Sequence, residues 1–592
     1  MQKTKNIKAI RERDIYLSLG VLLTVVFGYF YFIANYVLHF QETQSLFVFS
    51  GEYFQKSLLK PGGLLEYAAR FLAQFYHSRI IGSLILAVVL VLPGLILHSI
   101  NKRLIPGISF SLLILLIPSF ALLIMQANYF HLMEFNLGFV LILGYYLFSI
   151  SSDKRMRQVI VIIIFPLIYF ISGAYAVIFI IMYIIHNIVQ AKNKAGLIFS
   201  LILTAVAAMS FLVLWKFILL QPVEQFILSP LPLLKNDLYR AIFIILGGYI
   251  VLYPLVCLFA GRSGNSILNR PLYTFISIIA VFAFTLIILF NTYNTQTSRV
   301  VELQNLIFEE KWEDAVKFQE KKPARNLIGE YFYNIALSET GQLCDRLFSG
   351  SQDFGTNALV LPWGDEHLNR GAWFYYSIGL MNEAHRWAYE EMVVYGQRPQ
   401  NIELLAKTSL ISGKYAMATK YINILRKTVY YRKTALELEK LVGNPELISS
   451  DPELGPKQKL LPKSDFFIQF NEPQVNIPLM LEAQPDNRKA FEYYMAGLLL
   501  TKNVETIIIN VSKMKEIGYT GIPRHIEEAI LLYNNSTRTM PDLGGLTINP
   551  ETKLRFDHYF TSYVEARKNP STLKEKMKKQ FGDTFWYYFH FN

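Results

Sequence analysis

The sequence predicts an all-α protein in two parts: a polytopic transmembrane helix bundle of about nine spans over residues 1–290, and an α-solenoid over residues 291–592. The first observation is composition, because the 592-residue chain is 53% hydrophobic and only 17% charged, whereas soluble proteins average about 25% charged residues. The second is a split along the chain, since long and nearly uncharged apolar runs end near residue 290 and charge density is ordinary beyond it. These observations exclude an intrinsically disordered chain, and a total of two cysteines, Cys257 and Cys344, excludes a disulfide scaffold.

Nine apolar segments before residue 290 approach the length of about 20 residues that a bilayer-spanning helix needs. They are Ile15–Leu38, Ile80–His98, Ile105–Met125, Phe135–Ile150, Val159–Ile171, Ala174–Val189, Leu197–Trp215, Ala241–Ala260 and Leu272–Phe290. The uncharged stretch from Val159 to Gln190 is too long for one helix and short for two. Because basic residues flank both of its ends, we expect two short helices that turn near Ser172 and Gly173, which returns both flanks to one side of the membrane.

The distribution of basic residues predicts a cytoplasmic N-terminus and a tail on the opposite, extracytoplasmic side. Basic residues precede the first span and recur in every loop on the same side of a nine-span bundle. They are Lys3, Lys5, Lys8, Arg11, Arg13, Lys102, Arg103, Lys154, Arg155, Arg157, Lys192, Lys194, Arg262 and Arg270. No Ala-x-Ala cleavage site follows the first apolar run, which favours a retained span over a secretory signal. Membrane orientation therefore accounts for much of the +12 formal charge, and no nucleic-acid partner is expected.

The connection from Gln41 to Arg79 is long but not polar. After Lys60-Pro61-Gly62-Gly63, apolar residues recur at three- and four-residue steps, which is typical of one face of a helix. These residues are Leu64, Leu65, Ala68, Phe71, Leu72 and Phe75, with Glu66, Arg70, Gln74 and His77 on the polar side. The pattern predicts two amphipathic helices along the bilayer surface, broken at Pro-Gly-Gly. One interpretation is that they only cap the helix bundle, and the other is that they build a site.

The order of these features resembles the GT-C superfamily of polyprenyl-sugar-dependent glycosyltransferases. The shared features are a cytoplasmic N-terminus, a first span, an acidic residue just beyond it (Glu42), a long first outer loop with interfacial helices, and an outward soluble domain that closes the bundle. Some members of that superfamily carry tetratricopeptide arrays as the tail. The segments Gln41–Gln44, Pro61–Tyr67, Thr340–Leu343 and Asp345–Phe348 also resemble an uncharacterised family of bacterial inner-membrane proteins. Together the resemblances imply a multi-pass inner-membrane protein with a periplasmic tail.

The GT-C resemblance implies that Glu42 is the catalytic base that acts on the acceptor hydroxyl. Transfer of a sugar from a lipid phosphate requires proton removal from the nucleophile and neutralisation of the leaving phosphate. The candidate substrate-binding residues on the same side of the membrane are Arg70, Arg79, His131, Glu134 and Lys216. For the cations the alternative is snorkelling to lipid headgroups, and for His131 and Glu134, which are three residues apart, it is a polar turn at the interface.

No metal and no cofactor are expected. A single Glu between two glutamines, at Gln41 to Gln44, is a poor match to the acidic pair that would hold a divalent ion. The chain also lacks a Gly-rich phosphate loop, a paired Cys-x-x-Cys and a His-Glu-x-x-His motif. Soluble nucleotide-dependent chemistry therefore has no support in the sequence.

From about Thr297 the pattern is helical with polar faces, and it resembles tetratricopeptide-like repeats. Aromatic and Ala residues recur within Leu303–Phe318, Ser377–Val393, Leu410–Leu425 and Lys489–Met514, and the last three also contain a Gly. Their irregular period predicts a solenoid, which would present a concave binding surface. We expect loops at Ser349–Trp373, which could reach a binding groove, and at Gly443–Pro478. The aromatic run Phe585–Phe591 is expected to pack as a final strand or helix, with docking on lipid as the alternative.

Two functions stay open from the sequence. The first is a membrane glycosyltransferase that moves a sugar from a polyprenyl-phosphate-linked donor to an envelope acceptor, while the tail binds a protein or glycan partner. The second is a non-catalytic, membrane-anchored helical-repeat scaffold for envelope assembly, although nine spans exceed what an anchor needs. A transporter would require buried charges or broken helices at mid-membrane, which the spans almost lack. Membrane lipids are expected partners in either case.

Overall fold

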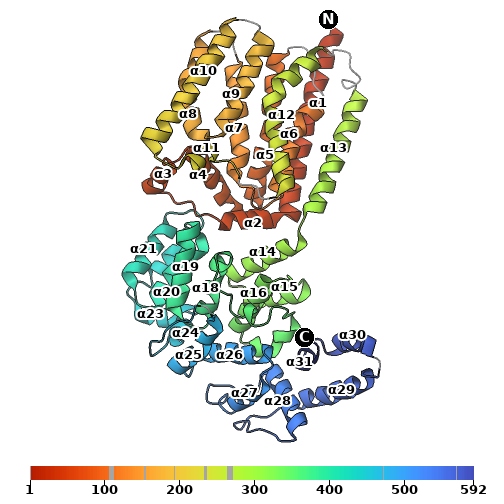
Figure 1. Cartoon of the computed structure of the whole chain (residues 1–592), viewed down its shortest axis with the longest axis vertical. Coiled ribbons are helices and arrows are strands. Elements are labelled where there is room, and N and C mark those ends of the chain that lie inside the picture. The colour runs from red at the N-terminus through yellow and green to blue at the C-terminus, as the bar shows by residue number, and fades with distance from the viewer. Residues whose placement is uncertain are drawn as a thin grey trace. The chain divides into compact units, whose positions relative to one another are not determined.

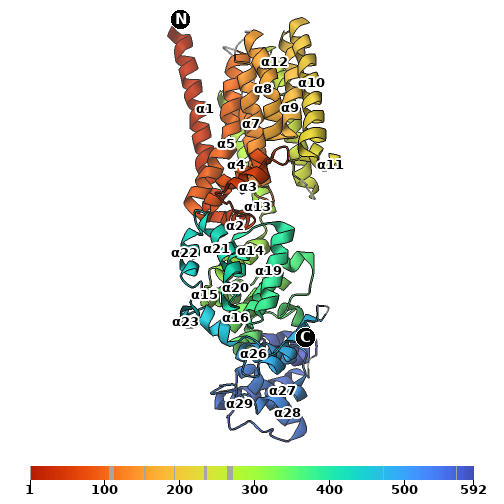
Figure 2. The ribbon, with the colours of Figure 1, turned by 90° about the vertical axis from the view of Figure 1, so that its left-hand side faces the viewer.

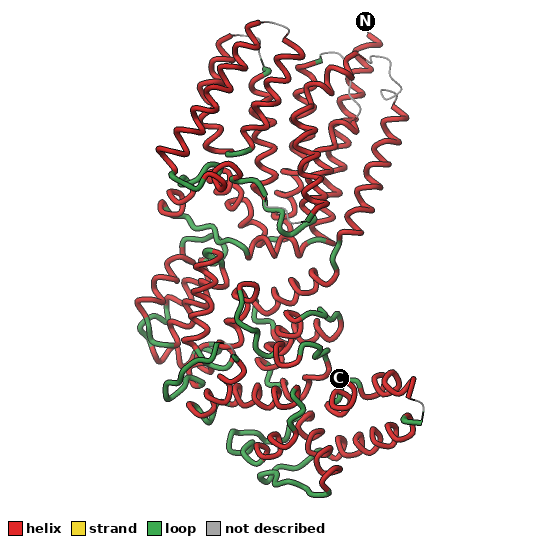
Figure 3. Tube along the Cα trace, in the orientation of Figure 1, coloured by secondary structure: helices red, strands yellow, loops and turns green. Residues whose placement is uncertain are grey.

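The computed structural model describes residues 2–105, 112–151, 155–191, 194–232, 236–262, 271–470, 472–568 and 570–592. Within these ranges every regular element is a helix, so the all-α prediction is confirmed (Figure 3). The chain divides into two compact units, Met1–Tyr293 and Asn294–Asn592. Three of the basic residues that we assigned to cytoplasmic loops, Lys154, Lys192 and Arg270, lie outside the described residues.

The first unit consists mainly of long apolar helices that lie side by side (Figure 1). They are α1 Gln2–Gly28, α5 Arg79–Leu104, α6 Leu112–Gln126, α7 Met133–Ser149, α8 Arg155–Ser172, α9 Tyr175–His186, α10 Lys194–Val213, α12 Asp237–Arg262 and α13 Pro271–Thr292. The turn predicted between α8 and α9 is present, because α8 ends at Ser172 and Gly173 takes a φ of +56°.

Several of these helices are long and apolar enough to cross a membrane. Four segments pass by length and composition: Ile15–Ile33, Arg79–Leu104, Gly196–Leu219 and Asp237–Phe259. A fifth is added if Ile278–Thr292 is counted together with the helix that follows it. Four further apolar helices are shorter, namely Ile114–Gln126, Met133–Ser149, Met156–Ser172 and Tyr175–Val189. Helices that could cross a membrane are therefore present, while the count of nine spans stays a prediction.

The first apolar segment ends earlier than predicted. We expected one span from Ile15 to Leu38, but a π-helical turn at Tyr29–Ile33 (η1) follows α1, and Ala34 leaves the helical conformation with φ −104° and ψ 28°. A new helix, α2 Asn35–Thr43, starts after this break. The N–H group of Ala34 bonds to the Tyr29 carbonyl, five residues back, which widens the last turn and redirects the chain. Glu42 therefore lies in the last turn of α2 rather than in a loop.

The connection after α2 contains the predicted pair of helices and the predicted break. They are α3 Gly51–Ser57 and α4 Gly63–Ala73, and a 3₁₀ turn, η2 Gln74–His77, continues α4. Leu46–Phe49, which precedes these helices, is not helical, and Phe71 of the predicted apolar face is exposed. Phe71 instead contacts Phe47, which also meets Phe49, Tyr53 and Tyr67. An aromatic cluster of this kind is typical of a membrane interface.

The break between α3 and α4 is fixed to a distant part of the first unit. Gly62 takes a φ of +78°, and a Cβ atom there would lie 2.4 Å from Pro230 Cδ, so only glycine fits. Ser229 Oγ donates to the Pro61 carbonyl at 2.8 Å, and Gln221 Nε2 donates to the Leu59 carbonyl at 2.9 Å. The segment that carries these groups follows η4 Leu214–Leu219 and includes α11 Val223–Leu228. The first outer loop and residues 221–230 are therefore joined at several points.

The second unit is a succession of helices in which neighbours along the chain pack against one another, most regularly from α18 to α22 (Figure 2). They are α14 Thr295–Phe308, α15 Trp312–Lys321, α16 Leu327–Glu339, α17 Leu343–Arg346, α18 Leu368–Ser377, α19 Met381–Tyr395, α20 Pro399–Ile411, α21 Tyr415–Arg426, α22 Arg432–Glu439, α23 Pro445–Ser450, α24 Leu454–Lys459, α25 Asn476–Ala483, α26 Arg488–Leu500, α27 Val504–Val511, α28 Arg524–Thr537, α29 Pro550–Ala566, α30 Pro570–Phe581 and α31 Phe585–Phe591. The likeness to tetratricopeptide repeats stays a prediction.

Two local predictions for the tail have clear outcomes. The aromatic run forms α31, which packs on α28 with Phe585 and Trp586 buried, and Trp586 Nε1 donates to the Glu528 carbonyl at 2.7 Å. The prediction of a packed helix is therefore confirmed. The segments that we expected to be loops are partly helical, because Gly443–Pro478 includes α23 and α24, and Ser349–Trp373 includes the start of α18.

Candidate functional site

The predicted site residues of the first outer loop lie on short helices at one end of the first unit. Both ribbon views show α2, α3 and α4 at the end opposite the N-terminus (Figures 1 and 2). Here α2 packs on η2, and Glu42 Oε1 lies 3.8 Å from His77 Nδ1. The Glu42 side chain is 9% exposed, whereas that of His77 is 46% exposed. A buried carboxylate therefore faces an imidazole that reaches the surface.

Beside Glu42, a buried network of uncharged side chains joins α2 to α6 and α7. Gln41 Nε2 donates to the His131 carbonyl at 2.8 Å, and Gln126 Nε2 donates to Gln41 Oε1 at 3.3 Å. Asn136 Nδ2 donates to Gln126 Oε1 at 2.6 Å, and Asn136 Oδ1 lies 3.0 Å from His131 Nε2. All four side chains are buried. We call Gln41, Gln126, His131 and Asn136 the amide network.

Burial lowers the pKa of His131 to about 4, although its bond to Asn136 opposes the shift. The imidazole is therefore neutral near pH 7, and it lies inside the amide network. A neutral, enclosed ring offers no positive charge to a phosphate. The structure thus gives His131 a packing and hydrogen-bonding environment that differs from the exposed cation a phosphate site needs.

A charged group surrounds Arg70 on α4. Arg70 Nη2 lies 3.7 Å from Glu66 Oε2, Arg70 Nη1 lies 3.5 Å from the Tyr53 hydroxyl, and Lys60 Nζ donates to Glu66 Oε1. Desolvation lowers the pKa of Arg70, but Tyr53, Glu66 and Glu134 more than offset it, so the net shift is upward. Glu134, buried in the first turn of α7, is therefore close enough to influence this guanidinium. The direct partners of Arg70 are Glu66 and Tyr53, and Glu134 acts on it only through its charge.

Arg79 and Lys216 lie apart from that group. Arg79 begins α5, donates to the Tyr31 carbonyl and lies over the Tyr31 ring, with Cζ 4.8 Å from the centroid. Tyr31 therefore engages the Arg79 guanidinium through both a hydrogen bond and a cation–π contact. Lys216 is exposed on η4. Neither cation has a described contact with Glu42 or Arg70, so the predicted set divides into separate groups.

Sequence reasoning did not assign a role to His77, which the structure places beside Glu42. The helical period put His77 on the polar side of α4, and that was the one available signal. Nothing in the spacing of the two residues, which are 35 positions apart along the chain, indicates their approach. Together, Glu42 and His77 can hold or move a proton, because a carboxylate beside an imidazole raises its basicity and orients it.

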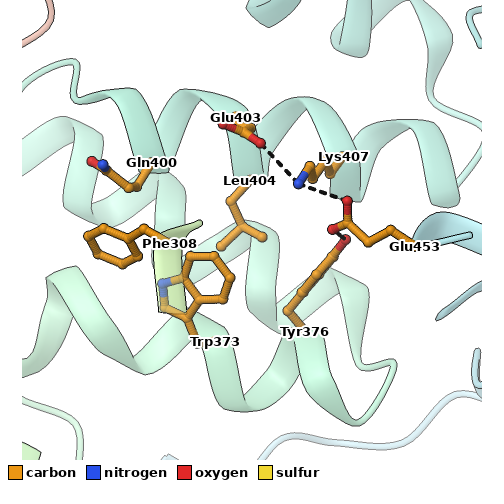
Figure 4. Close-up of a pocket in the computed structure, with 8 residues that line it drawn as sticks. All are labelled: Phe308, Trp373, Tyr376, Gln400, Glu403, Leu404, Lys407 and Glu453. Atoms are coloured by element: carbon orange, nitrogen blue, oxygen red, sulfur yellow. Dashed lines mark hydrogen bonds and ion pairs between the residues drawn. The ribbon is translucent and has the colours of Figure 1, made fainter. Parts of the chain in front are cut away.

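The second unit holds a buried ion cluster of its own (Figure 4). Lys407 Nζ lies 2.7 Å from Glu310 Oε1, 2.9 Å from Glu403 Oε1 and 2.8 Å from Glu453 Oε2. Burial lowers the pKa of Lys407, but the three carboxylates outweigh it and raise the pKa well above its ordinary value. The adjoining cavity, about 10 Å³ and lined by Phe308 and Trp373 among others, is near the minimum for one water molecule. We interpret this lysine cluster as structural.

In the described part of the chain, no group of three or more His, Cys, Asp or Glu residues is arranged to hold a metal ion. No curated protein and no solved structure matches this chain. One family does match, and it covers residues 13–592, almost the whole sequence. The chain therefore belongs to the family of unknown function DUF6057.

Proposed function

We propose that this protein is a membrane glycosyltransferase that moves a sugar from a polyprenyl-phosphate-linked donor to an envelope acceptor, with its tail binding the acceptor or a partner. The observation that carries the proposal is the pairing of buried Glu42 with exposed His77 at 3.8 Å. The pair lies at the end of the first unit that carries the interfacial helices α3 and α4 (Figure 1). An acidic residue just beyond a first span is also the feature that the GT-C resemblance assigns to catalysis.

In the proposed reaction the acceptor hydroxyl loses its proton to the His77–Glu42 pair. The acceptor oxygen attacks the anomeric carbon of the donor sugar, the bond from that carbon to the phosphate oxygen breaks, and the phosphate leaves with the electron pair. Glu42 holds the imidazolium that forms, in the way that a buried carboxylate supports a catalytic histidine. This refines the initial expectation, because the exposed imidazole meets the substrate and Glu42 acts through it.

The leaving phosphate needs a positive partner on the same side. Arg70 is the best-placed cation, since its guanidinium is half-exposed and its pKa is raised rather than lowered by its surroundings. Its contact with Glu66 is long, at 3.7 Å, so a phosphate can compete for it. Arg79 and Lys216 are assigned to headgroup contacts at the same interface.

The proposed membrane arrangement has nine spans, a cytoplasmic N-terminus and a periplasmic tail at the inner membrane. It supports the reaction because it puts Glu42, Arg70 and the tail in one aqueous compartment. The nine apolar segments and the basic residues between alternate pairs favour it. Labelling of intact cells at cysteines introduced at the exposed positions 52 and 592 tests it, and opposite sidedness would contradict the whole proposal.

The decisive variant is Glu42→Gln in the full chain, reconstituted in lipid nanodiscs with a pool of radiolabelled polyprenyl-phosphate sugars. We expect transfer to fall by about 10²- to 10⁴-fold, which is the usual contribution of general acid–base catalysis. Donor lipid retained in native mass spectrometry should not change, since Glu42 does not hold the phosphate. Glu52→Gln is the matched control, because that glutamate is exposed on α3. Full transfer by Glu42→Gln would remove the residue from the mechanism.

The second candidate, a non-catalytic scaffold for envelope assembly, is favoured by the amide network. The amide network fills the space next to Glu42 with side chains that hydrogen-bond to one another, as a purely structural cap would. In that case Glu42→Gln changes nothing measurable. Loss of envelope assembly on disrupting the network, with no donor lipid retained by the wild-type chain, would favour the scaffold.

A further inference from the structure

A cavity of about 270 Å³ lies within the second unit, where α17 packs on α26 and α28. It is lined by Gly341, Cys344, Asp345, Arg488, Glu492 and residues 519–523. Two of the segments singled out in the sequence, Thr340–Leu343 and Asp345–Phe348, supply one wall. The proposed transfer chemistry does not use them. The volume is slightly below the usual range for small-molecule pockets, about 300–1,000 Å³, so it suits a ligand of one or two rings.

Glu492 lines this cavity, and one of its two carboxylate oxygens is a buried, unsatisfied acceptor. Its side chain is 3% exposed, and Oε1 lies 3.4 Å from Arg488 Nε. The second oxygen, Oε2, is buried without a hydrogen-bond partner. Burial raises the pKa of Glu492, although Lys489 and Arg488 oppose the shift. Leaving a buried carboxylate oxygen unpaired is costly, and a ligand hydroxyl that donated to it would recover that cost.

The charges around the cavity balance. Asp345 and Glu492 are acidic, whereas Arg488 and the neighbouring Lys489 are basic, and the other three groups all act on the Glu492 carboxyl. Asp345 Oδ1 already accepts from the Arg524 N–H group at 2.8 Å, and the Cys344 thiol donates to the Glu492 carbonyl. A free cation and a free anion would each meet as much repulsion as attraction here. The site instead offers acceptors and donors together.

A flat polar surface completes the site. The Arg488 guanidinium stacks on the Tyr519 ring, with Cζ 4.2 Å from the centroid, which holds its remaining donors in a fixed plane. A neutral molecule with many hydroxyl groups matches this arrangement, because each hydroxyl both donates and accepts. We propose that the cavity between α17, α26 and residues 519–523 binds a sugar unit through Glu492 and Arg488. This site lies in the second unit, whereas the proposed transfer reaction takes place in the first. Sugar binding here therefore does not depend on the transferase proposal.

The test is saturation-transfer NMR on the full chain in nanodiscs, with D-glucose, D-mannose, D-galactose and N-acetyl-D-glucosamine added singly. We expect at least one sugar to bind. Glu492→Gln should weaken that binding about tenfold or more, because it removes a charged acceptor from the hydrogen bond. Glu505→Gln, an exposed glutamate on α27, is the matched control and should bind as the wild type does.

A second variant keeps the test independent of folding around Glu492. Gly521 lines the cavity, and a Cβ atom placed there meets no other atom within 4 Å. Gly521→Leu should therefore fold normally, as a thermal melt can check, and reduce sugar binding by filling space. Choline and citrate serve as cationic and anionic probes, and tighter binding of either would overturn the assignment of a neutral ligand.

The proposal also fails if none of the four sugars binds, or if Glu492→Gln and Gly521→Leu both bind as the wild type does. Glu42→Gln should bind sugar normally. Lost transfer in Glu42→Gln and lost binding in Glu492→Gln therefore report on separate proposals.

Discussion

The first unit encloses Gln41, Gln126, His131 and Asn136 as an uncharged network, whereas the second encloses Lys407 among three carboxylates. The difference between an uncharged and a charged network reflects the environment of each one. Among apolar helices, a charge would lose its hydration without recovering it, so amides and a neutral imidazole join the helices at lower cost. In the second unit the carboxylates around Lys407 keep partial contact with solvent. The comparison between these two networks indicates that a buried polar group is stabilised either by neutral partners or by opposite charges that keep some solvent contact.

The largest expected effect comes from removing the central charge of the lysine cluster. Lys407→Met leaves Glu310, Glu403 and Glu453 close together without a counter-charge, so the free energy of unfolding should fall by about 3–5 kcal/mol. Denaturant unfolding followed by tryptophan fluorescence measures this, since Trp373 lines the same cavity. Lys433→Met, at an exposed lysine, is the control. Equal stability of the two variants would show that burial of the cluster is less complete than described.

The next effect depends on pH. Burial raises the pKa of Glu391 to about 7 from an ordinary value of 4.5, although Arg398 opposes the shift. Between these values the folded chain binds more protons than the unfolded chain, so the free energy of unfolding falls as pH rises through that window. Glu391→Gln cannot titrate and should flatten this slope, with a difference of no more than about 3 kcal/mol.

The measurement is denaturant unfolding of both chains at about pH 5 and about pH 7.5. Glu390→Gln, the same chemical change on the same helix, is the control. Parallel pH profiles for the wild type and Glu391→Gln would contradict the assignment.

The smallest effect probes the first unit. Asn136→Leu leaves Gln126 Oε1 and His131 Nε2 without their partner, so the free energy of unfolding should fall by about 1–3 kcal/mol. Thermal melting of the full chain in nanodiscs follows the change. Adding Gln126→Leu removes the orphaned Gln126 Oε1 but also the donor to Gln41 Oε1, so the loss in the double variant should differ from the sum of the two single losses. If the two changes simply add, the two amides do not act as a pair.

Features with a local cause could be predicted from the sequence. Pro61-Gly62-Gly63 breaks the outer helices, and Gly173 turns α8 into α9, because glycine accepts a positive φ. The aromatic run at α31 could be expected to pack because it is too apolar for solvent. The approach of His77 to Glu42, and of Glu310 and Glu453 to Lys407, could not be predicted. These contacts depend on how distant helices meet, and helical periodicity carries no information on that.

The join between the first outer loop and residues 221–230 restricts how a long lipid could enter the first unit. Gln221 holds the Leu59 carbonyl, Ser229 holds the Pro61 carbonyl, and Pro230 fills the space beside Gly62. A movement that separated the first outer loop from residues 221–230 would have to break all three of these contacts.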